Sequence, residues 1–199
     1  MRTTVQASER ARIEGGVTAA KGFRSAGVHC GIKTQKKDLA LLVCDTLASA
    51  AGMFTTNAVR AAPVLVSQER IQSGAARAII VNSGNANAAT GAQGLRDALE
   101  MAALTAQALG VAEEFVLVAS TGVIGIPLPM EAIRSGIPTV ISALSTDGAP
   151  AAEAILTTDA FPKTAGVRVE IGGVPVTLDR KSTRLNSSHI QKSRMPSSA

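Results

Sequence analysis

The stretch VASTGVIGIPLP, residues 118–129, holds the residues best suited to chemistry. Thr121 and Gly122 stand there directly after an apolar run that is typical of a buried strand. Small residues at such a place leave backbone N–H groups free to point at a ligand, and such donors suit an anion or a developing oxyanion. The glycine spacing meets neither the dinucleotide-binding nor the P-loop fingerprint. From these residues alone an ordinary glycine-rich turn is the favoured interpretation, and an oxyanion-binding turn is the functional alternative.

A second polar stretch, VNSGNANAATG at residues 81–91, also follows a strand-like run. It contains Asn82, Asn85 and Asn87. Asparagine amides can fix the backbone of a loop through local hydrogen bonds, or they can present donors to a substrate. We favour the scaffolding role, because a loop so rich in Gly, Ala and Asn needs local bonds to hold a shape.

Few other polar residues are candidates for chemistry. Thr157, Thr158 and Asp159 lie where a predicted helix ends, and they suit either a ligand or a turn. His29 is the one histidine before residue 179, so a Ser-His-Asp triad would have to use it. His29 and the adjacent Cys30 are too few ligands for a metal, and no carboxylate cluster adds to them. These residues give no convincing nucleophile and no metal site.

Hydrophobic periodicity predicts the elements that position these stretches. Strands are expected at 38–46, 63–67, 76–84 and 115–120, and helices at 68–74, 91–109, 129–135 and 150–156. The helix at 91–109 carries an apolar stripe of Leu95, Leu99, Ala102, Ala106 and Leu109. A hairpin is expected at 167–178, with a Gly172-Gly173 turn and with Pro175 placing its second strand at an edge or a bulge. Together these elements predict an α/β fold, a mixed sheet with helices packed on it.

Composition and charge exclude several classes of partner. The 199 residues are 46% hydrophobic, with four Phe and neither Trp nor Tyr. Of the net charge of +5, residues 179–199 contribute +4, since residues 1–178 carry 15 basic and 14 acidic side chains. We therefore expect no nucleic acid partner. No apolar run is long enough for a membrane span, and two cysteines without a CxxC pair indicate a reduced, cytoplasmic protein.

The last 21 residues read unlike the rest of the chain. DRKSTRLNSSH and SRMPSSA resemble the translation of a common sequencing-adapter oligonucleotide. We therefore expect residues 1–178 to be the folded part, 179–199 to be a non-native, disordered tail, and the natural sequence to continue past Leu178. A natural Ser- and Arg-rich tail is the alternative.

Several long motifs, in order, resemble those of the ornithine acetyltransferase (glutamate N-acetyltransferase) family of arginine biosynthesis. They are GVTAAKGFRSAGVHCGIK (16–33), AGMFTTNAVRAAPV (51–64), AIIVNSGNANAATG (78–91), STGVIGIPLPM (120–130) and AILTTDAFPK (154–163). The resemblance covers residues 13–178. It implies that this chain is the α-chain part of a self-processing enzyme.

The resemblance also implies a mechanism. The precursor cuts itself before a threonine, and the new N-terminal threonine takes acetyl from N-acetylornithine and passes it to glutamate. Some members also use acetyl-CoA as a donor, and no other cofactor is implied. The oxyanion-hole pair carries over to Thr121 and Gly122, and a substrate-binding threonine carries over to Thr157. The α chain is expected to assemble with the β chain of the same precursor, two copies of each.

This sequence departs from the family pattern after residue 178. The nucleophilic threonine, a substrate-binding lysine and the whole β chain are missing, so we expect this chain alone to be inactive. Two alternatives are a self-cleaving aminopeptidase-like hydrolase and a non-catalytic α/β module that binds a small molecule.

Overall fold

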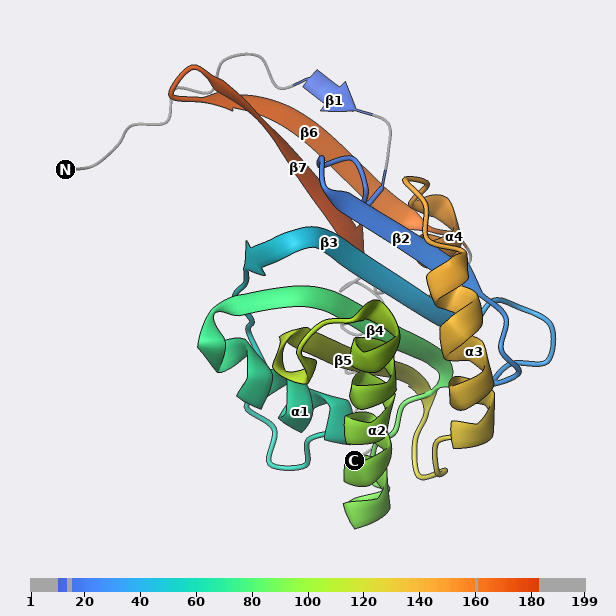
Figure 1. The fold of residues 1–199 in the computed structure, drawn as a ribbon. Helices are drawn as coiled ribbons and strands as arrows, with labels where there is room; N and C mark the ends of the chain where they lie inside the picture. The colour runs from blue at the N-terminus through green and yellow to red at the C-terminus, as the bar shows by residue number, and fades with distance from the viewer. Residues whose placement is uncertain (1–10, 14–15, 160, 183–199) are drawn as a thin grey trace, which may run out of the picture.

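The computed structural model describes residues 11–13, 16–159 and 161–182, and its centre is a four-stranded sheet (Figure 1). The strands are β2 (Phe23–Val28), β3 (Leu39–Ser49), β4 (Ala75–Asn85) and β5 (Val116–Val123), and they lie in that order. β2 and β4 each pair with β3 in the antiparallel sense, whereas β4 and β5 are parallel. The predicted mixed α/β sheet is confirmed.

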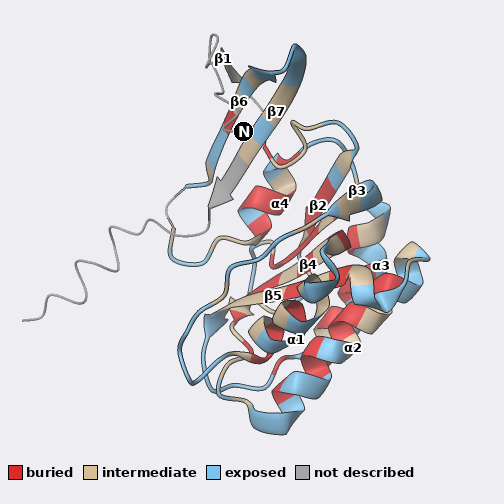
Figure 2. Cartoon of the chain, turned by 90° about the vertical axis from the view of Figure 1, so that its left-hand side faces the viewer, coloured by how far each residue is buried: buried red, intermediate tan, exposed pale blue. Residues whose placement is uncertain are grey.

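Helices cover the two faces of this sheet unequally. One face carries α1 (Ala62–Arg70), α2 (Gly91–Leu109) and α3 (Met130–Ser142), and the other carries the short α4 (Ala149–Ala154) (Figures 1 and 2). Two 3-10 turns, Ile71–Ser73 and Glu113–Phe115, lead into β4 and β5. No helix in the described part of the chain is long and apolar enough to cross a membrane.

Strand residues alternate between these faces, as the period of a strand requires. Leu41, Ile80 and Val118 point into the main core under α1, α2 and α3. On the opposite face, Ala40 and Val81 pack with α4 in a second, smaller cluster. Both faces are therefore apolar, and the second has the thinner cover.

A separate three-stranded antiparallel sheet contains β1 (Ala11–Ile13), β6 (Lys163–Ile171) and β7 (Val174–Ser182), in the order β1-β6-β7. Its hairpin turns at Gly172 and Gly173 as predicted, and Pro175 lies on the edge strand β7. In Figure 2 this hairpin stands away from the main body and is largely exposed.

The boundary expected at residue 178 falls inside β7. Residues 179–182 continue its pairing with β6, so the expectation of disorder from residue 179 onward does not hold for them. The turn sets the register of the hairpin, and backbone pairing on an exposed edge accepts polar side chains. Residues 183–199, the remainder of the expected tail, lie outside the described residues.

Two predicted elements were wrong in type or length. Residues 63–67 belong to α1 rather than to a strand, and Pro63 is in its first turn, where a missing N–H costs nothing. The helix expected to stop before Gly136 continues to Ser142, through Pro138. Gly136 is no cap: a Cβ there would lie 2.5 Å from Cβ of Cys30, so the glycine allows α3 to pack closely.

Candidate functional site

The ends of β4 and β5 lie side by side. The first candidate pair, Thr121 and Gly122, lies at the end of β5 and faces the end of β4. Ser83 is opposite Thr121, and Gly84 is opposite Gly122. Gly122 is exposed and has a φ of 142°. A Cβ on it would lie 2.3 Å from the carbonyl carbon of Gly84, so only glycine fits where these two backbones nearly touch.

The backbone N–H of Gly122 points away from β4. Ser67 Oγ accepts from the Val118 N–H (2.9 Å) and donates to the Val118 carbonyl (2.6 Å), so this edge of β5 faces α1. The backbone groups of Val123 point toward β4, because its carbonyl accepts a hydrogen bond from the Ala86 N–H (2.8 Å). The N–H and carbonyl groups of successive strand residues point to opposite edges of the strand. Those of Gly122 therefore point to the same outer edge as those of Val118. In the part of the chain that the structure describes, β5 is the last strand of its sheet.

Thr121 adds a second potential donor. Its side chain is half-buried and lies on the α4 face of the sheet, as that of its neighbour Ser83 does. Within the described ranges, its hydroxyl makes no side-chain hydrogen bond. The hydroxyl of Thr121 and the N–H of Gly122 thus lie next to each other at the end of an edge strand, where a ligand oxygen could accept from both.

The side-chain amides of the asparagines near this pair already donate hydrogen bonds to backbone carbonyls. Asn82, fully buried, donates to the Asn85 carbonyl (2.8 Å) and accepts from Ser120 Oγ (2.5 Å). The Asn85 amide donates to the carbonyls of residues 126 and 127, both at 3.0 Å. These bonds fix the loop that follows Gly122 against the end of β4. The two asparagines are therefore scaffolding rather than ligand donors.

Asn87 completes this network and holds the start of α2. It is fully buried at a φ of 44°, a left-handed conformation that asparagine tolerates. Its amide donates to the Gly94 carbonyl (2.8 Å), and its carbonyl oxygen accepts from Thr90 Oγ1 (2.8 Å). The asparagine-rich stretch is thus built to hold its own backbone and the helix that follows.

Thr157 follows α4 and is exposed. The end of α4 is tied to β4, because Ser83 Oγ donates to the Ala154 carbonyl. Since Ser83 is the neighbour of Thr121, this bond brings the segment that leads to Thr157 to the same end of the same sheet face. Asp159, by contrast, is engaged in an ion pair with Lys163.

A buried carboxylate that sequence reasoning missed organises the loop that contains His29 and Cys30. Asp38 accepts from the N–H groups of Cys30 (2.7 Å), Lys33 (2.9 Å) and Gly31 (3.2 Å). Burial raises the pKa of Asp38, but the donors at Lys33 and Cys30 oppose this, and the net pKa lies below its ordinary value.

The same carboxylate explains why His29 and Cys30 are structural. Burial, together with the hydrogen bond and charge of Asp38, raises the pKa of Cys30 to about 12, so its thiol stays protonated at neutral pH. His29 Nδ1 lies 3.2 Å from the Asp38 carboxylate and 2.9 Å from the Lys36 carbonyl. Neither side chain is placed as a nucleophile or a base for the Thr121–Gly122 pair.

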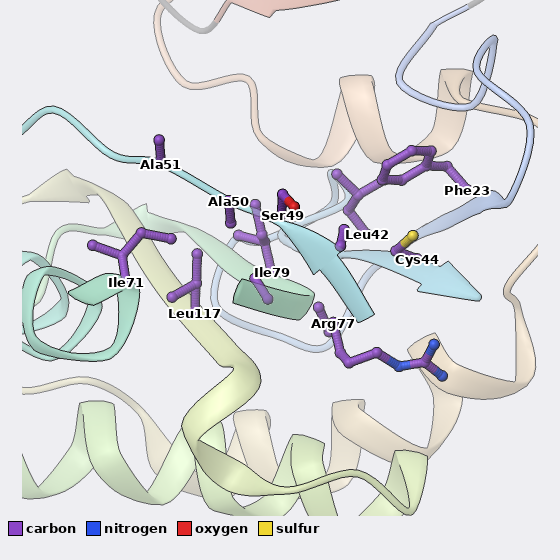
Figure 3. Close-up of a pocket in the computed structure, with 13 residues that line it drawn as sticks. Phe23, Leu42, Cys44, Ser49, Ala50, Ala51, Ile71, Arg77, Ile79 and Leu117 are labelled. Carbon is purple, nitrogen blue, oxygen red and sulfur yellow. The ribbon is translucent and has the colours of Figure 1, made fainter. Parts of the chain in front are cut away.

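The sheet face under α4 also has an uncovered part, which forms an open hollow of about 300 Å³ (Figure 3). Leu42, Ile79 and Leu117 form a row across three neighbouring strands there, each half-buried. None of the residues singled out from the sequence lines this hollow. Its chemistry is that of an apolar packing surface.

Comparison with known proteins gives a consistent result. The model of the ArgJ family matches residues 24–180. The chain is 54% identical over 170 residues to the arginine biosynthesis bifunctional protein ArgJ of Symbiobacterium thermophilum, and 48% identical over 185 residues to that of Shouchella clausii. These matches cover 83% and 92% of this chain but 42% and 43% of the relatives. The chain thus spans less than half of their length.

Two solved structures share the fold. The arginine biosynthesis bifunctional protein ArgJ of Bacillus halodurans has a TM-score of 0.85 and 41% identity, over 89% of this chain and 95% of that one. Ornithine acetyltransferase of Mycobacterium tuberculosis, solved with ornithine, has a TM-score of 0.81 and 39% identity, over 87% and 95%.

Proposed function

The chain belongs to the ArgJ family, and from this premise we propose that it is the α-chain part of an enzyme that transfers acetyl from N-acetylornithine to glutamate. The single observation that carries the proposal is the pair of donors at the end of β5: the Gly122 N–H faces the outer edge of the sheet, and the adjacent Thr121 hydroxyl makes no side-chain hydrogen bond among the described residues. The proposal includes arginine biosynthesis as the pathway and the cytoplasm as the location.

Acetyl transfer needs such a pair because each half-reaction passes through a tetrahedral oxyanion. Donors fixed before the reaction stabilise that charge, and one donor typically lowers the barrier by about 2.7–4 kcal/mol. In our proposal Thr121 and Gly122 hold the oxyanion, and the nucleophile is a threonine that self-cleavage exposes in the sequence beyond this chain. The amine of an N-terminal threonine can act as the base, so no histidine is required.

Thr157 is proposed to bind the substrate. It is exposed, and the tie between Ser83 and the end of α4 holds its segment near the end of β4. N-acetylornithine and glutamate are the proposed substrates, and acetyl-CoA is a further acetyl donor rather than a resident cofactor. The ornithine found with the Mycobacterium tuberculosis structure is consistent with an amino-acid substrate.

The proposed partner is the β chain, the remainder of the same precursor. Leu42, Ile79 and Leu117 leave a row of half-exposed apolar side chains on the thinly covered sheet face. Apolar sheet faces are stable when another layer covers them. The additional length of the curated relatives offers that layer. We propose that two α and two β chains assemble.

The test is to join residues 1–178 to the downstream segment that the relatives carry. We expect the product to split into two chains and to exchange acetyl between ornithine and glutamate, whereas the 199-residue chain alone has neither activity. A product that hydrolyses peptides without acetyl exchange would favour the aminopeptidase alternative. A 199-residue chain that is monomeric, unfolds cooperatively and gains nothing from the added segment would favour a binding module.

A further inference from the structure

Lys33 links two parts of the proposed site that are far apart in sequence. Its Nζ donates to the carbonyls of Leu156 (2.6 Å), Lys37 (3.0 Å) and Ala154 (3.4 Å). An ammonium group has three donors, so these bonds use all of them. Leu156 directly precedes Thr157, and the shortest of the three contacts therefore lies on the backbone next to the proposed substrate-binding residue.

The other end of the side chain touches the end of β4. A Cβ on Gly84 would lie 3.0 Å from Cγ of Lys33, so the apolar stem of the lysine fills the space above that glycine. Gly84 is in turn the close neighbour of Gly122. A single side chain thus contacts the strand end beside the proposed oxyanion donors and the segment that leads to Thr157.

The environment of the ammonium group favours a fixed position. Lys33 is half-buried, and burial lowers its pKa, with the charge of Asp38 opposing this. A partly desolvated cation is stable only with good partners, so the amine is held to the carbonyls of residues 154 and 156. Asp38 also accepts from the Lys33 N–H and so fixes the backbone from which the side chain extends.

We propose that Lys33 is a positioning residue that sets the distance between Thr157 and the Thr121–Gly122 pair. The inference rests on the proposed function and concerns the same site. Lys33 acts through the backbone of residue 156 and does not itself touch the substrate. Its loss therefore alters substrate binding through Thr157 more than it alters the chemical step.

The experiment uses the full-length protein with its downstream segment. Lys33→Met keeps the apolar stem over Gly84 but removes the three donated bonds. We expect the KM for N-acetylornithine to rise about tenfold and kcat to change less than twofold. Lys37→Met is the matched control, because it removes an ion pair (2.8 Å) to the side chain of Glu153 on α4 and leaves the bond to the Leu156 carbonyl in place. We expect its KM to be unchanged.

A double-mutant cycle separates positioning from general stability. In a Thr157→Ala protein, Lys33→Met should raise KM less than twofold further, because the residue that it positions is already gone. A full tenfold rise there, or an unchanged KM in Lys33→Met alone, would overturn the proposal.

If Lys33→Met fails to fold, Lys33→Arg replaces it. We expect a KM rise of about threefold, and an unchanged KM overturns the proposal. Absence of acetyl exchange in the unmodified full-length protein would instead refute the proposed function.

Discussion

β4 and β5 run in parallel and end side by side, but their ends differ in what the polar groups do. At the end of β4 and just beyond it, the amides of Asn82, Asn85 and Asn87 all donate to backbone carbonyls. At the end of β5, the Gly122 N–H faces the outer edge of the sheet. The amides at the first strand end are bonded within the protein, whereas the second strand end has the donors that we propose for a ligand.

This difference fits what the proposed oxyanion site requires. A donor that waits for an oxyanion must not move when the charge develops, and it must not be satisfied beforehand. The asparagine network supplies the rigidity, because Asn85 holds the carbonyls of residues 126 and 127 just after the Thr121–Gly122 pair. Changes at the end of β4 should therefore lower stability, and changes at the end of β5 should lower the rate.

Gly122 belongs to both regions, and Gly122→Ala should have the largest effect. The added Cβ would meet the Gly84 backbone at 2.3 Å, at a φ of 142°. We expect the free energy of unfolding to fall by about 3 kcal/mol and acetyl transfer to fall at least a thousandfold. Urea denaturation and initial rates of the full-length protein measure the two effects.

Gly110→Ala is the control for Gly122→Ala. Gly110 has a φ of 67° at the end of α2, but open space surrounds its Cβ position. It should cost only the left-handed backbone strain, about 1 kcal/mol, with no loss of rate. Equal effects of the two substitutions would show that the close contact between the strand ends is unimportant.

Thr121→Val should separate rate from stability. Valine keeps the shape of threonine and removes only the hydroxyl, which has no side-chain partner within the described ranges. We expect acetyl transfer to slow about 100- to 1,000-fold, the typical cost of one oxyanion donor, and the unfolding free energy to change by less than about 0.5 kcal/mol. Thr139→Val, at an exposed position on α3, should change neither. A normal rate in Thr121→Val would remove this hydroxyl from the mechanism.

The sequence predicted the elements that have long or distinctive patterns. α2 was predicted with its observed bounds, and the hairpin with its Gly172-Gly173 turn. The apolar stripe on α2 was only partly right, because Leu95 and Leu99 are exposed while Ala98 and Met101 face the core. Small residues let the helix approach the sheet, and counting large apolar side chains misses that. The strand predicted at residues 63–67 was wrong because a short apolar run fits a strand and a buried helix equally well.

The site shows a similar division. The expected turn at Thr121 and Gly122 was wrong in type, because β5 continues to Val123 and both residues lie within its end. Local composition predicted the scaffolding asparagines. Lys33 and Asp38 were missed, because their roles depend on partners brought close only by the fold. Lys33 contacts the carbonyl of Leu156, 123 positions along the chain. A lysine in a loop has no sequence pattern that distinguishes such a contact from exposure to solvent.

Asn87→Ala tests the β4 side of the comparison. The substitution removes the amide that donates to Gly94 and the oxygen that accepts from Thr90, and it places alanine at a positive φ. We expect the unfolding free energy to fall by about 2–3 kcal/mol, because buried groups lose their partners. Asn57→Ala, in an exposed loop, should cost less than about 0.5 kcal/mol. If kcat of Asn87→Ala fell a hundredfold while its stability stayed normal, the division between the two strand ends would be wrong.

Asp38→Asn should have the smallest effect, and this effect depends on pH. The pKa of Asp38 is below its ordinary value in the folded protein, so its carboxylate stabilises the fold above about pH 4, the ordinary pKa of an unfolded Asp, and loses this effect as the pH falls through the folded pKa. We expect Asp38→Asn to cost about 2 kcal/mol at pH 7, because asparagine cannot replace a carboxylate that accepts three N–H groups. The difference in unfolding free energy from the unmodified protein should shrink below pH 4 in urea denaturation.

Asp45→Asn, at an exposed ion pair, is the control and should show a difference of less than about 1 kcal/mol at every pH. A constant cost of Asp38→Asn from pH 7 to pH 3 would mean that the charge of this carboxylate does not hold the loop that carries Lys33.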